Sequence, residues 1–254
     1  MSGRVALVTG AGRGIGRATA EMLARRGDQV MAVSRTEAEL AGLARLAPVT
    51  YLVESVATPE GCARIAEETW KRLGPIEILV NNAGMGSMDE SEIWVEDPAV
   101  WRESIATNLT APYELTRLAL PAMIEAGYGR VVMVGSAAST ESGVAAGMPA
   151  YAAGKHGLLG LTRAVALDVA PHGVTCNAVL PGSVRTKTAE LKVEREAASA
   201  GITVEQAWSA RVSRYRAGRL VTAEEVAEAI LFLASEAASG VNGVGLLVAL
   251  QGHV

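Results

Sequence analysis

The chain has 254 residues and a formal net charge of −4; half of its residues are hydrophobic and 4% are aromatic. A chain of this length can bury one continuous core, which must be built from Val, Ala, Leu and Ile because aromatic residues are so few. The mild acidity, without a run of Lys or Arg, argues against nucleic acid and an anionic membrane surface as partners. We therefore expect a single domain over residues 1–254.

The cysteines and the N-terminal stretch indicate the compartment. Cys62 and Cys176 cannot supply a disulfide framework, and neither stands in a cluster with metal-ligand spacing. The first apolar stretch, Val5–Val8, is far too short for the core of a signal peptide or for a membrane span. We predict a soluble, cytoplasmic protein in a reducing setting.

The order of apolar runs predicts the fold. Seven short, Val-rich runs are predicted strands: Val5–Val8, Gln29–Val33, Val49–Val53, Ile76–Val80, Val131–Val134, Val174–Val179 and Gly243–Leu250. Segments with helical spacing lie between them: Arg17–Arg26, Glu37–Leu46, Pro59–Leu73, Trp101–Glu125, Ala152–Val169 and Ala223–Ala234. This alternation predicts an α/β fold, a Rossmann-like, doubly wound, seven-stranded and mostly parallel sheet with helices on both faces.

Two stretches interrupt the alternation. Gly84–Pro98 is a polar loop after the fourth predicted strand, and residues 183–219 form a long, charged insertion after the sixth. Ligands of doubly wound sheets bind beyond the carboxyl ends of the strands, and both stretches leave from those ends. We expect them to form the walls of a substrate site.

A glycine-rich turn follows the first predicted strand and opens a helix. Residues 9–16 read Thr-Gly-Ala-Gly-Arg-Gly-Ile-Gly. Glycines permit a tight turn and let backbone amides approach a pyrophosphate, whose charge the helix N-terminus favours. The turn could be purely structural, but the preceding strand and the following helix favour phosphate binding. The candidate binding residues are Gly10, Arg13, Gly14, Ile15 and Gly16.

The spacing of these glycines resembles the Thr-Gly-x-x-x-Gly-x-Gly motif of the short-chain dehydrogenase/reductase family. Residues 81–84 read Asn-Asn-Ala-Gly and are similar to a second motif of that family. The resemblance covers essentially the whole chain and implies an oxidoreductase with a nicotinamide dinucleotide cofactor. It also implies a cofactor-flanking turn formed by Asn82, Ala83 and Gly84.

The end of the second predicted strand bears on which dinucleotide binds. An acidic residue there would accept hydrogen bonds from the adenosine ribose of NAD and repel a 2′-phosphate. This chain has Ser34 and Arg35 instead. Arg35 can pair with a 2′-phosphate, with Arg13 as a second cation and Ser34 as a donor. Both arginines could also be solvated surface charges, but we favour NADP(H) as the cofactor.

The chain departs from the family after the third predicted strand. The family usually has Asp-Val there, and the Asp meets the adenine amino group. Here Ser55 takes the Asp position and Val56 follows. A hydroxyl accepts such a bond more weakly than a carboxylate, so we expect a weaker adenine contact.

Tyr151 and Lys155 begin the helix after the fifth predicted strand. Residues four apart lie on one helix face, so the phenol and the ammonium point into the same space. A purely structural pair, a half-buried Tyr beside a Lys that extends its ammonium to solvent, would have the same sequence spacing. A cation about 4 Å away would lower the phenol pKa by roughly three units and bring it into the working range of an acid/base catalyst. Resemblance to the family implies that this Lys also holds the nicotinamide ribose, and that Tyr151 and Lys155 both belong to the cofactor site.

Ser136 ends the fifth predicted strand and can hydrogen-bond a carbonyl oxygen as negative charge develops on it. It resembles the catalytic Ser of the family, although its distance from Tyr151 indicates an insertion between Ala137 and Pro149. Ser139 is the rival. We favour Ser136 because it directly ends a strand, where side chains are held most rigidly.

Two further positions follow from the resemblance. Asn108 matches a fourth catalytic residue, which holds a water that links the Lys to solvent. A lone helical Asn is otherwise usually structural. Residues 181–186 read Pro-Gly-Ser-Val-Arg-Thr and resemble the motif beside the nicotinamide. The cofactor residues implied there are Pro181, Gly182, Val184 and Thr186.

The histidines give no metal site or catalytic triad. His156 follows Lys155 and points off the catalytic face, His172 lies in a turn and His253 in the tail. None has a partner at ligand spacing. We predict no metal ion.

The sequence therefore predicts an NADP(H)-dependent oxidoreductase that reduces a carbonyl or oxidises the alcohol, acting on a small molecule. Two branches of the family fit, 3-oxoacyl or polyketide ketoreductases and NAD-dependent 3-hydroxybutyrate dehydrogenases. The second branch carries a carboxylate-binding Lys where this chain has Met148, so the first is favoured. A catalytically silent NADP-binding sensor or scaffold is the alternative from another class. The substrate, its stereochemistry and the direction of reaction stay open.

The resemblance also implies assembly. Members of the family commonly form tetramers through their long helices and the last strand, and we expect a homotetramer or a homodimer. The family's usual Val-Asp-Gly-Gly ending is replaced here by Val-Ala-Leu-Gln-Gly at residues 248–252. This more apolar ending weakens the prediction of a tetramer.

Overall fold

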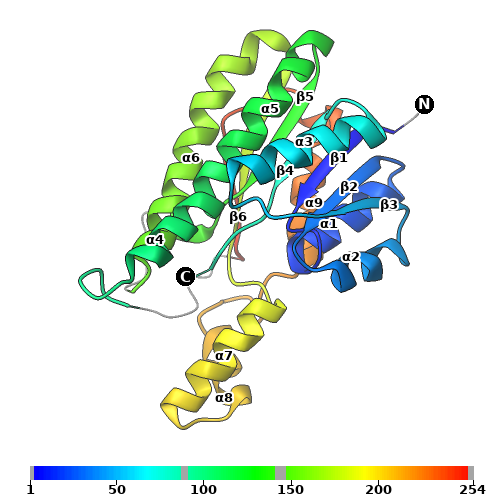
Figure 1. Cartoon of the computed structure of the whole chain (residues 1–254). Helices are drawn as coiled ribbons and strands as arrows, with labels where there is room; N and C mark the ends of the chain where they lie inside the picture. Colours follow the sequence, from blue (N-terminus) through cyan, green and yellow to red (C-terminus); the bar gives the residue numbers. More distant parts are fainter. Residues whose placement is uncertain (1–2, 87–90, 141–146, 251–254) are drawn as a thin grey trace.

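A seven-stranded sheet forms the centre of the computed structural model, which describes residues 3–86, 91–140 and 147–250 (Figure 1). Its strand order is β3-β2-β1-β4-β5-β6-β7, and every neighbouring pair is parallel. The strands are β1 (Val5–Thr9), β2 (Gln29–Ser34), β3 (Val49–Val53), β4 (Ile78–Asn81), β5 (Gly129–Val134), β6 (Val174–Pro181) and β7 (Gly245–Val248). The predicted seven-stranded Rossmann-like sheet is confirmed, and it is entirely parallel.

Helices cover both faces of the sheet because consecutive strand residues point to opposite sides. On one face, Val8 of β1 packs in a core with helices α1, α2 and α9; on the other, Leu7 of β1 packs with α3, α5 and α6. The bounds are α1 (Gly14–Arg25), α2 (Glu37–Ala44), α3 (Pro59–Leu73), α4 (Pro98–Ile105), α5 (Ala111–Ala126), α6 (Pro149–Val169) and α9 (Ala223–Leu233).

The prediction of one continuous helix over Trp101–Glu125 is wrong, because the helix is interrupted. A π-helical turn, Ala106–Thr110, separates α4 from α5. Pro112 supplies a physical reason, because it has no N–H to donate to the carbonyl of Asn108 four residues earlier, and its ring crowds that carbonyl. The interruption places Asn108 on the widened turn.

The insertion after β6 forms two helices that project from the body of the molecule, α7 (Lys187–Ala200) and α8 (Val204–Val212) (Figure 1). Their contact buries a small separate cluster of Val193, Ala197 and Ala207, with Trp208 packed against it. Each helix starts at a threonine whose hydroxyl accepts a backbone N–H of the first turn, Thr186 for α7 and Thr203 for α8. The sequence predicted a long, charged insertion here without assigning helices to it.

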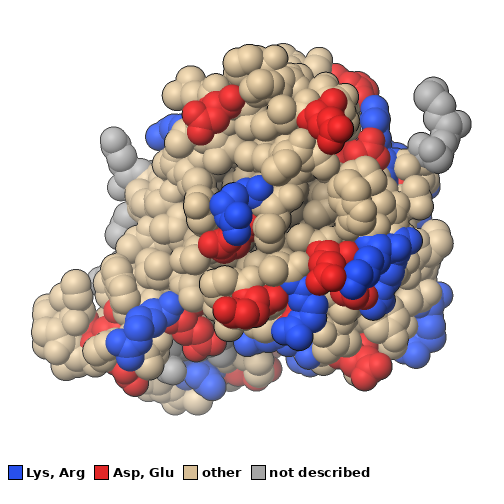
Figure 2. Space-filling model, turned by 45° about the horizontal axis from the view of Figure 1, so that its top comes forward, with Lys and Arg blue, Asp and Glu red and all other residues tan. Residues whose placement is uncertain are grey.

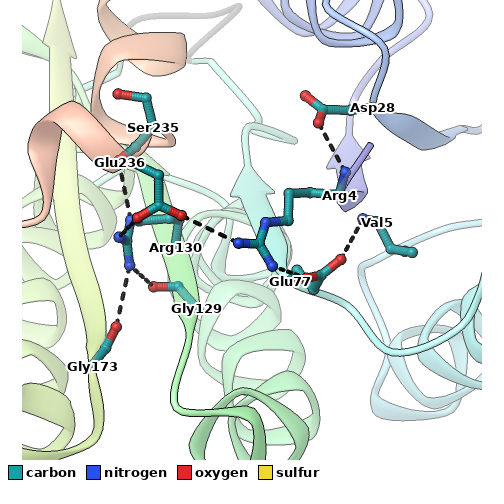
Figure 3. A network of polar contacts seen from close by, with 9 residues as sticks. All are labelled: Arg4, Val5, Asp28, Glu77, Gly129, Arg130, Gly173, Ser235 and Glu236. Atoms are coloured by element: carbon teal, nitrogen blue, oxygen red, sulfur yellow. Dashed lines mark hydrogen bonds and ion pairs between the residues drawn. The ribbon is translucent and has the colours of Figure 1, made fainter. Parts of the chain in front are cut away.

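A polar network ties the amino ends of the strands together (Figure 3). Arg130 is only 2% exposed; it donates to the carbonyl oxygens of Gly129, Gly173 and Ser235 and pairs with Glu236. Arg4 pairs with Glu77 at 2.6 Å and with Glu236 at 3.2 Å. The ring of Tyr128 lies beside both guanidinium groups.

The face shown in Figure 2 carries basic and acidic side chains that are interspersed rather than gathered by sign. That arrangement agrees with the absence of a basic run in the sequence. Among the described helices, none is long and apolar enough to cross a membrane.

Candidate active site

A cleft of about 350 Å³ lies at the carboxyl ends of β1, β2, β3 and β4. This is where ligands of doubly wound sheets bind. Twelve of the predicted cofactor residues line it: Gly10, Arg13, Gly14, Ile15, Ser34, Arg35, Ser55, Val56, Asn82, Ala83, Gly84 and Thr186. The cleft therefore gathers positions that are as many as 176 residues apart in the sequence, since Gly10 and Thr186 both line it.

The glycine turn has the close backbone contacts that the sequence predicted. Gly10 and Gly14 have φ angles of +66° and +55°, which side chains rarely adopt. A β-carbon on Gly16 would lie 2.3 Å from the carbonyl oxygen of Gly10 and from Nδ2 of Asn82. Gly16 does not line the cleft, so its part is to allow this close packing.

Asn82 and Thr9 hold the turn against the strand β4. The Asn82 amide donates to the carbonyl oxygens of Thr9 at 2.8 Å and Gly10 at 3.2 Å. The Thr9 hydroxyl accepts the backbone N–H groups of Asn82 and Ala83. These bonds fix the floor of the cleft, where α1 begins with its first N–H groups.

The basic end of the cleft contains an acidic residue as well as the predicted cations. Arg35 is exposed and forms no ion pair with any described residue, whereas Arg13 lies 3.9 Å from the carboxylate of Glu39. Glu39 also lines the cleft. Glu39 was not among the predicted site residues, because a carboxylate was expected only at the end of β2, and Glu39 lies five residues further on in α2.

Ser55 and Val56 lie at the wall beyond β3. The Ser55 hydroxyl accepts the backbone N–H of Ala57 at 3.2 Å, and the Ser55 N–H donates to the carboxylate of Glu54. The turn thus holds Ser55 in place, and its hydroxyl oxygen already accepts one hydrogen bond from the backbone. Glu54 is paired in turn with Arg64.

Ser136, Tyr151 and Lys155 come together next to the cleft. The side chains of Ser136 and Tyr151 form a hydrogen bond, and Lys155 Nζ lies 6.0 Å from the centre of the Tyr151 ring. A β-carbon on Gly84, which lines the cleft, would lie 3.4 Å from Lys155 Nζ. The three side chains do not line the described cleft itself; they lie beyond its Gly84 end.

The prediction that Lys155 lowers the phenol pKa is wrong for this arrangement. Burial raises the pKa of Tyr151, and the hydrogen bond with Ser136 acts in the opposite direction. The ammonium of Lys155 donates to the carbonyl oxygen of Val134 at 2.8 Å rather than approaching the phenol. Burial also lowers the pKa of Lys155 to about 8, because a charged group is disfavoured away from water.

The structure separates the two candidate serines. Ser136 is partly exposed, hydrogen-bonds Tyr151 and accepts the backbone N–H of Ala138. Ser139 is 5% exposed, and its hydroxyl donates to the backbone carbonyl of Lys155 at 3.1 Å. Only Ser136 is placed beside the phenol.

Asn108 is fully buried and its side chain clamps the chain after β4. Its Oδ1 accepts the N–H of Met85, and its Nδ2 donates to the carbonyl oxygen of Met85 and to the Ser104 hydroxyl. A β-carbon on Gly84 would lie 3.1 Å from Asn108 Oδ1. The side chain therefore shapes the turn that carries Gly84, close to Lys155.

The motif after β6 reaches the cleft only through Thr186. Pro181 ends the strand, Gly182 donates to the carbonyl of Val248, and Val184 forms a bridge with Val221. These three residues do not line the described cleft. The methyl group of Thr186 lies 3.1 Å from a β-carbon placed on Gly14, so it closes the cleft over the glycine turn.

The histidines lie apart from this site. His156 is exposed and bonds the carbonyl of Ala152, and His172 is exposed in a short turn after α6. His253 lies outside the described residues. Within the described part of the chain, no group of three or more His, Cys, Asp or Glu side chains could hold a metal ion.

A family model described as short chain dehydrogenase matches residues 4–197. The chain belongs to the short-chain dehydrogenase family. The resemblance recognised from the two sequence motifs is therefore confirmed, and with it the assignment of the chain as an oxidoreductase.

Curated relatives cover almost the whole chain. The 3-oxoacyl-(acyl-carrier-protein) reductase FabG of Escherichia coli (strain K12) is 35% identical over 248 residues, which cover 97% of this chain and 96% of that protein. A D-beta-hydroxybutyrate dehydrogenase of Cupriavidus necator is 38% identical over 253 residues, with coverage of 96% and 95%. Both branches considered from the sequence are thus represented among the relatives.

Solved structures agree with the fold. A variant of actinorhodin polyketide ketoreductase, crystallised with NADPH, matches with a TM-score of 0.90 and 32% identity over 97% of this chain and 95% of that chain. Levodione reductase also matches with a TM-score of 0.90, at 28% identity over 97% and 96%.

Proposed function

We propose that this short-chain dehydrogenase uses NADP(H) to reduce a ketone to a secondary alcohol, or runs the reverse reaction. The observation that carries the proposal is the grouping of Ser136, Tyr151 and Lys155 beside the Gly84 end of a glycine-lined cleft. The names of two relatives, a 3-oxoacyl reductase and a polyketide ketoreductase, support carbonyl reduction of that class.

The residues present fit a phosphorylated dinucleotide. The turn at Gly10 and Gly14 exposes backbone N–H groups beside the start of α1. Arg35, which forms no ion pair with a described residue, lines the same cleft. Ser34 and Arg13 would add a donor and a second cation at the 2′-phosphate. That one structural neighbour was crystallised with NADPH agrees with this choice.

The remaining cofactor contacts follow from placement. Val56 and Ser55 would flank the adenine, the turn at Asn82, Ala83 and Gly84 would flank the ribose, and Ile15 would lie under the pyrophosphate. Thr186 is placed to close the cleft. We retain Pro181, Gly182 and Val184 as the nicotinamide side of the site because they precede Thr186 directly.

The proposed chemistry needs a donor, an acid and a cation. The bound cofactor supplies hydride. Ser136 donates a hydrogen bond to the carbonyl oxygen as charge develops on it, and Tyr151 donates the proton that completes the alcohol. Lys155, whose ammonium donates to the carbonyl oxygen of Val134, would hold the nicotinamide ribose of the bound cofactor, the role that the resemblance to the family implies. Asn108 keeps the Gly84 turn in place beside the ammonium.

A spectrophotometric screen of NADPH consumption across ketone classes, including 3-oxoacyl thioesters, tests the function. We expect turnover with at least one class and a loss of 100-fold or more, about 2.7 kcal/mol or above in activation free energy, in Tyr151→Phe, which removes the acid. NADPH should still bind that variant, because the other residues predicted to contact the cofactor are kept. Tight NADPH binding by the wild-type chain without turnover of any ketone would instead favour a catalytically silent sensor or scaffold.

An NAD-dependent hydroxy-acid dehydrogenase is the second candidate. The 38% identical D-beta-hydroxybutyrate dehydrogenase supports it. Two residues argue against it: Met148, at the start of α6, offers no charge to a substrate carboxylate, and Arg35 favours a 2′-phosphate. Adding 3-hydroxybutyrate with NAD⁺ to the screen separates the two candidates.

We further propose that residues 1–254 act as one catalytic domain and assemble into a homotetramer or a homodimer. Exposed apolar side chains on the long helices and the last strand support assembly, among them Trp101, Tyr113, Phe232 and Leu247. Gln251 and Gly252 of the altered ending lie outside the described residues. Light scattering coupled to size-exclusion chromatography measures the assembly.

The free, buried cysteines agree with a reducing, cytoplasmic setting.

A further inference from the structure

The basic end of the cleft contains a carboxylate that reaches the place proposed for the 2′-phosphate. Glu39 is the third residue of α2 and is only 24% exposed in its side chain. A β-carbon on Gly12 would lie 2.6 Å from Glu39 Oε2 and 2.8 Å from the hydroxyl of Ser34. The carboxylate and the hydroxyl therefore lie over the same glycine.

The same carboxylate is close to one of the two proposed cations. Arg13 Nη1 lies 3.9 Å from Glu39 Oε1, whereas Arg35 has no ion-pair partner among the described residues. A 2′-phosphate bound by Ser34 and Arg13 would come next to the charge of Glu39. Only Arg35 would then act on the phosphate without a competing anion.

Glu39 affects the two dinucleotides in opposite ways. Its negative charge repels a 2′-phosphate and takes up part of the attraction of Arg13, which weakens binding of NADPH. The adenosine ribose of NADH has a 2′-hydroxyl instead, and a carboxylate accepts hydrogen bonds from ribose hydroxyls in dinucleotide-binding folds. In those folds the acidic residue usually stands at the end of the second strand, whereas here it comes from the following helix.

We infer that Glu39 is a specificity-determining residue that reduces the advantage of NADPH over NADH, so that the chain binds both dinucleotides. This inference rests on the proposed dinucleotide-dependent function. It concerns the adenosine end of the cleft and is independent of which ketone is reduced.

The test measures dissociation constants of NADPH and NADH by fluorescence titration, without a carbonyl substrate, for the wild-type chain and for Glu39→Gln. The substitution keeps the size and the hydrogen-bonding reach of the side chain and removes its charge. We expect the ratio of the NADH constant to the NADPH constant to rise about fivefold, which is the upper range for a partly exposed charge pair. The rise should shrink at high salt, because exposed charges are screened.

Glu37→Gln is the matched control. Glu37 lies in the same turn of α2 and is exposed, but it does not line the cleft. An equal ratio in Glu39→Gln, Glu37→Gln and the wild-type chain would overturn the inference while leaving the proposed function intact. Failure of the wild-type chain to bind either dinucleotide would overturn both.

Discussion

Lys155 lies in a place that is unfavourable for its charge, so replacing it should stabilise the protein. Burial lowers its pKa from 10.5 to about 8. At about 1.4 kcal/mol per pKa unit, keeping this ammonium protonated inside the protein costs about 3 kcal/mol. Lys155→Met removes the charge and keeps an unbranched side chain of similar length. It also removes the hydrogen bond to the carbonyl of Val134, which offsets about 1 kcal/mol.

We therefore expect Lys155→Met to raise the free energy of unfolding by about 2 kcal/mol at pH 7 and to abolish turnover. The difference in unfolding free energy between the variant and the wild-type chain should become smaller as the pH rises. Below pH 8 both the folded and the unfolded wild-type chain hold the proton, and the penalty is fully present. Between pH 8 and 10.5 the folded chain has released the proton while the unfolded chain still binds it. The wild-type chain therefore gains stability relative to the variant as the pH rises through this window.

Urea denaturation at pH 7 and at several values up to pH 10, at fixed protein concentration, measures the difference. Lys187→Met is the control, because Lys187 is exposed at the start of α7, and its difference from the wild-type chain should stay nearly constant over the same range. A Lys155→Met chain that is less stable than the wild-type chain at pH 7, or a difference that does not change with pH, would refute the reasoning.

Three other substitutions test the site and its support. Gly16→Ala should lower the free energy of unfolding by about 1–3 kcal/mol and weaken NADPH binding, because its β-carbon would meet the Gly10 carbonyl oxygen at 2.3 Å. Urea denaturation measures the first effect and fluorescence titration the second. Gly160→Ala is the control, because no atom lies within 4 Å of its β-carbon. Ser136→Ala should lower kcat by about 100-fold or more while NADPH binding is retained. Ser139→Ala should instead lower the stability of the fold and leave most of kcat intact. The reverse outcome would make Ser139 the residue that polarises the carbonyl. Arg130→Met should cost about 2–3 kcal/mol in unfolding free energy without changing kcat, because it removes three hydrogen bonds to backbone carbonyl groups at the edge opposite the cleft. An altered kcat would contradict this separation.

Much of the fold could be predicted from the sequence because its signals are local. Each strand is a short apolar run next to a turn residue, and the alternation with helices leaves few topologies. The glycine turn and the Tyr151–Lys155 spacing are local as well. The parallel sheet brings the carboxyl ends of the strands together, so both patterns come to lie at the same edge of the sheet.

Two features were not predicted, the place of Glu39 in the cleft and the position of the Lys155 ammonium. Both depend on contacts between distant parts of the chain. Glu39 enters the cleft only because Gly12, in another loop, has no side chain to exclude it. The position of the Lys155 ammonium depends on the carbonyl of Val134, which lies 21 residues earlier. A signal for Glu39 did exist in the sequence, since an acidic residue in the first turn of the helix after β2 lies within reach of the glycine loop.

The raised pKa of Tyr151 determines which form of the phenol the site contains at neutral pH. A phenol whose pKa is raised by burial is protonated at pH 7, which is the form that donates a proton to a developing alkoxide. Oxidation of an alcohol needs the phenolate, which this burial disfavours and the hydrogen bond with Ser136 favours. Burial of Tyr151 therefore keeps the phenol in the form that the proposed reduction uses at neutral pH.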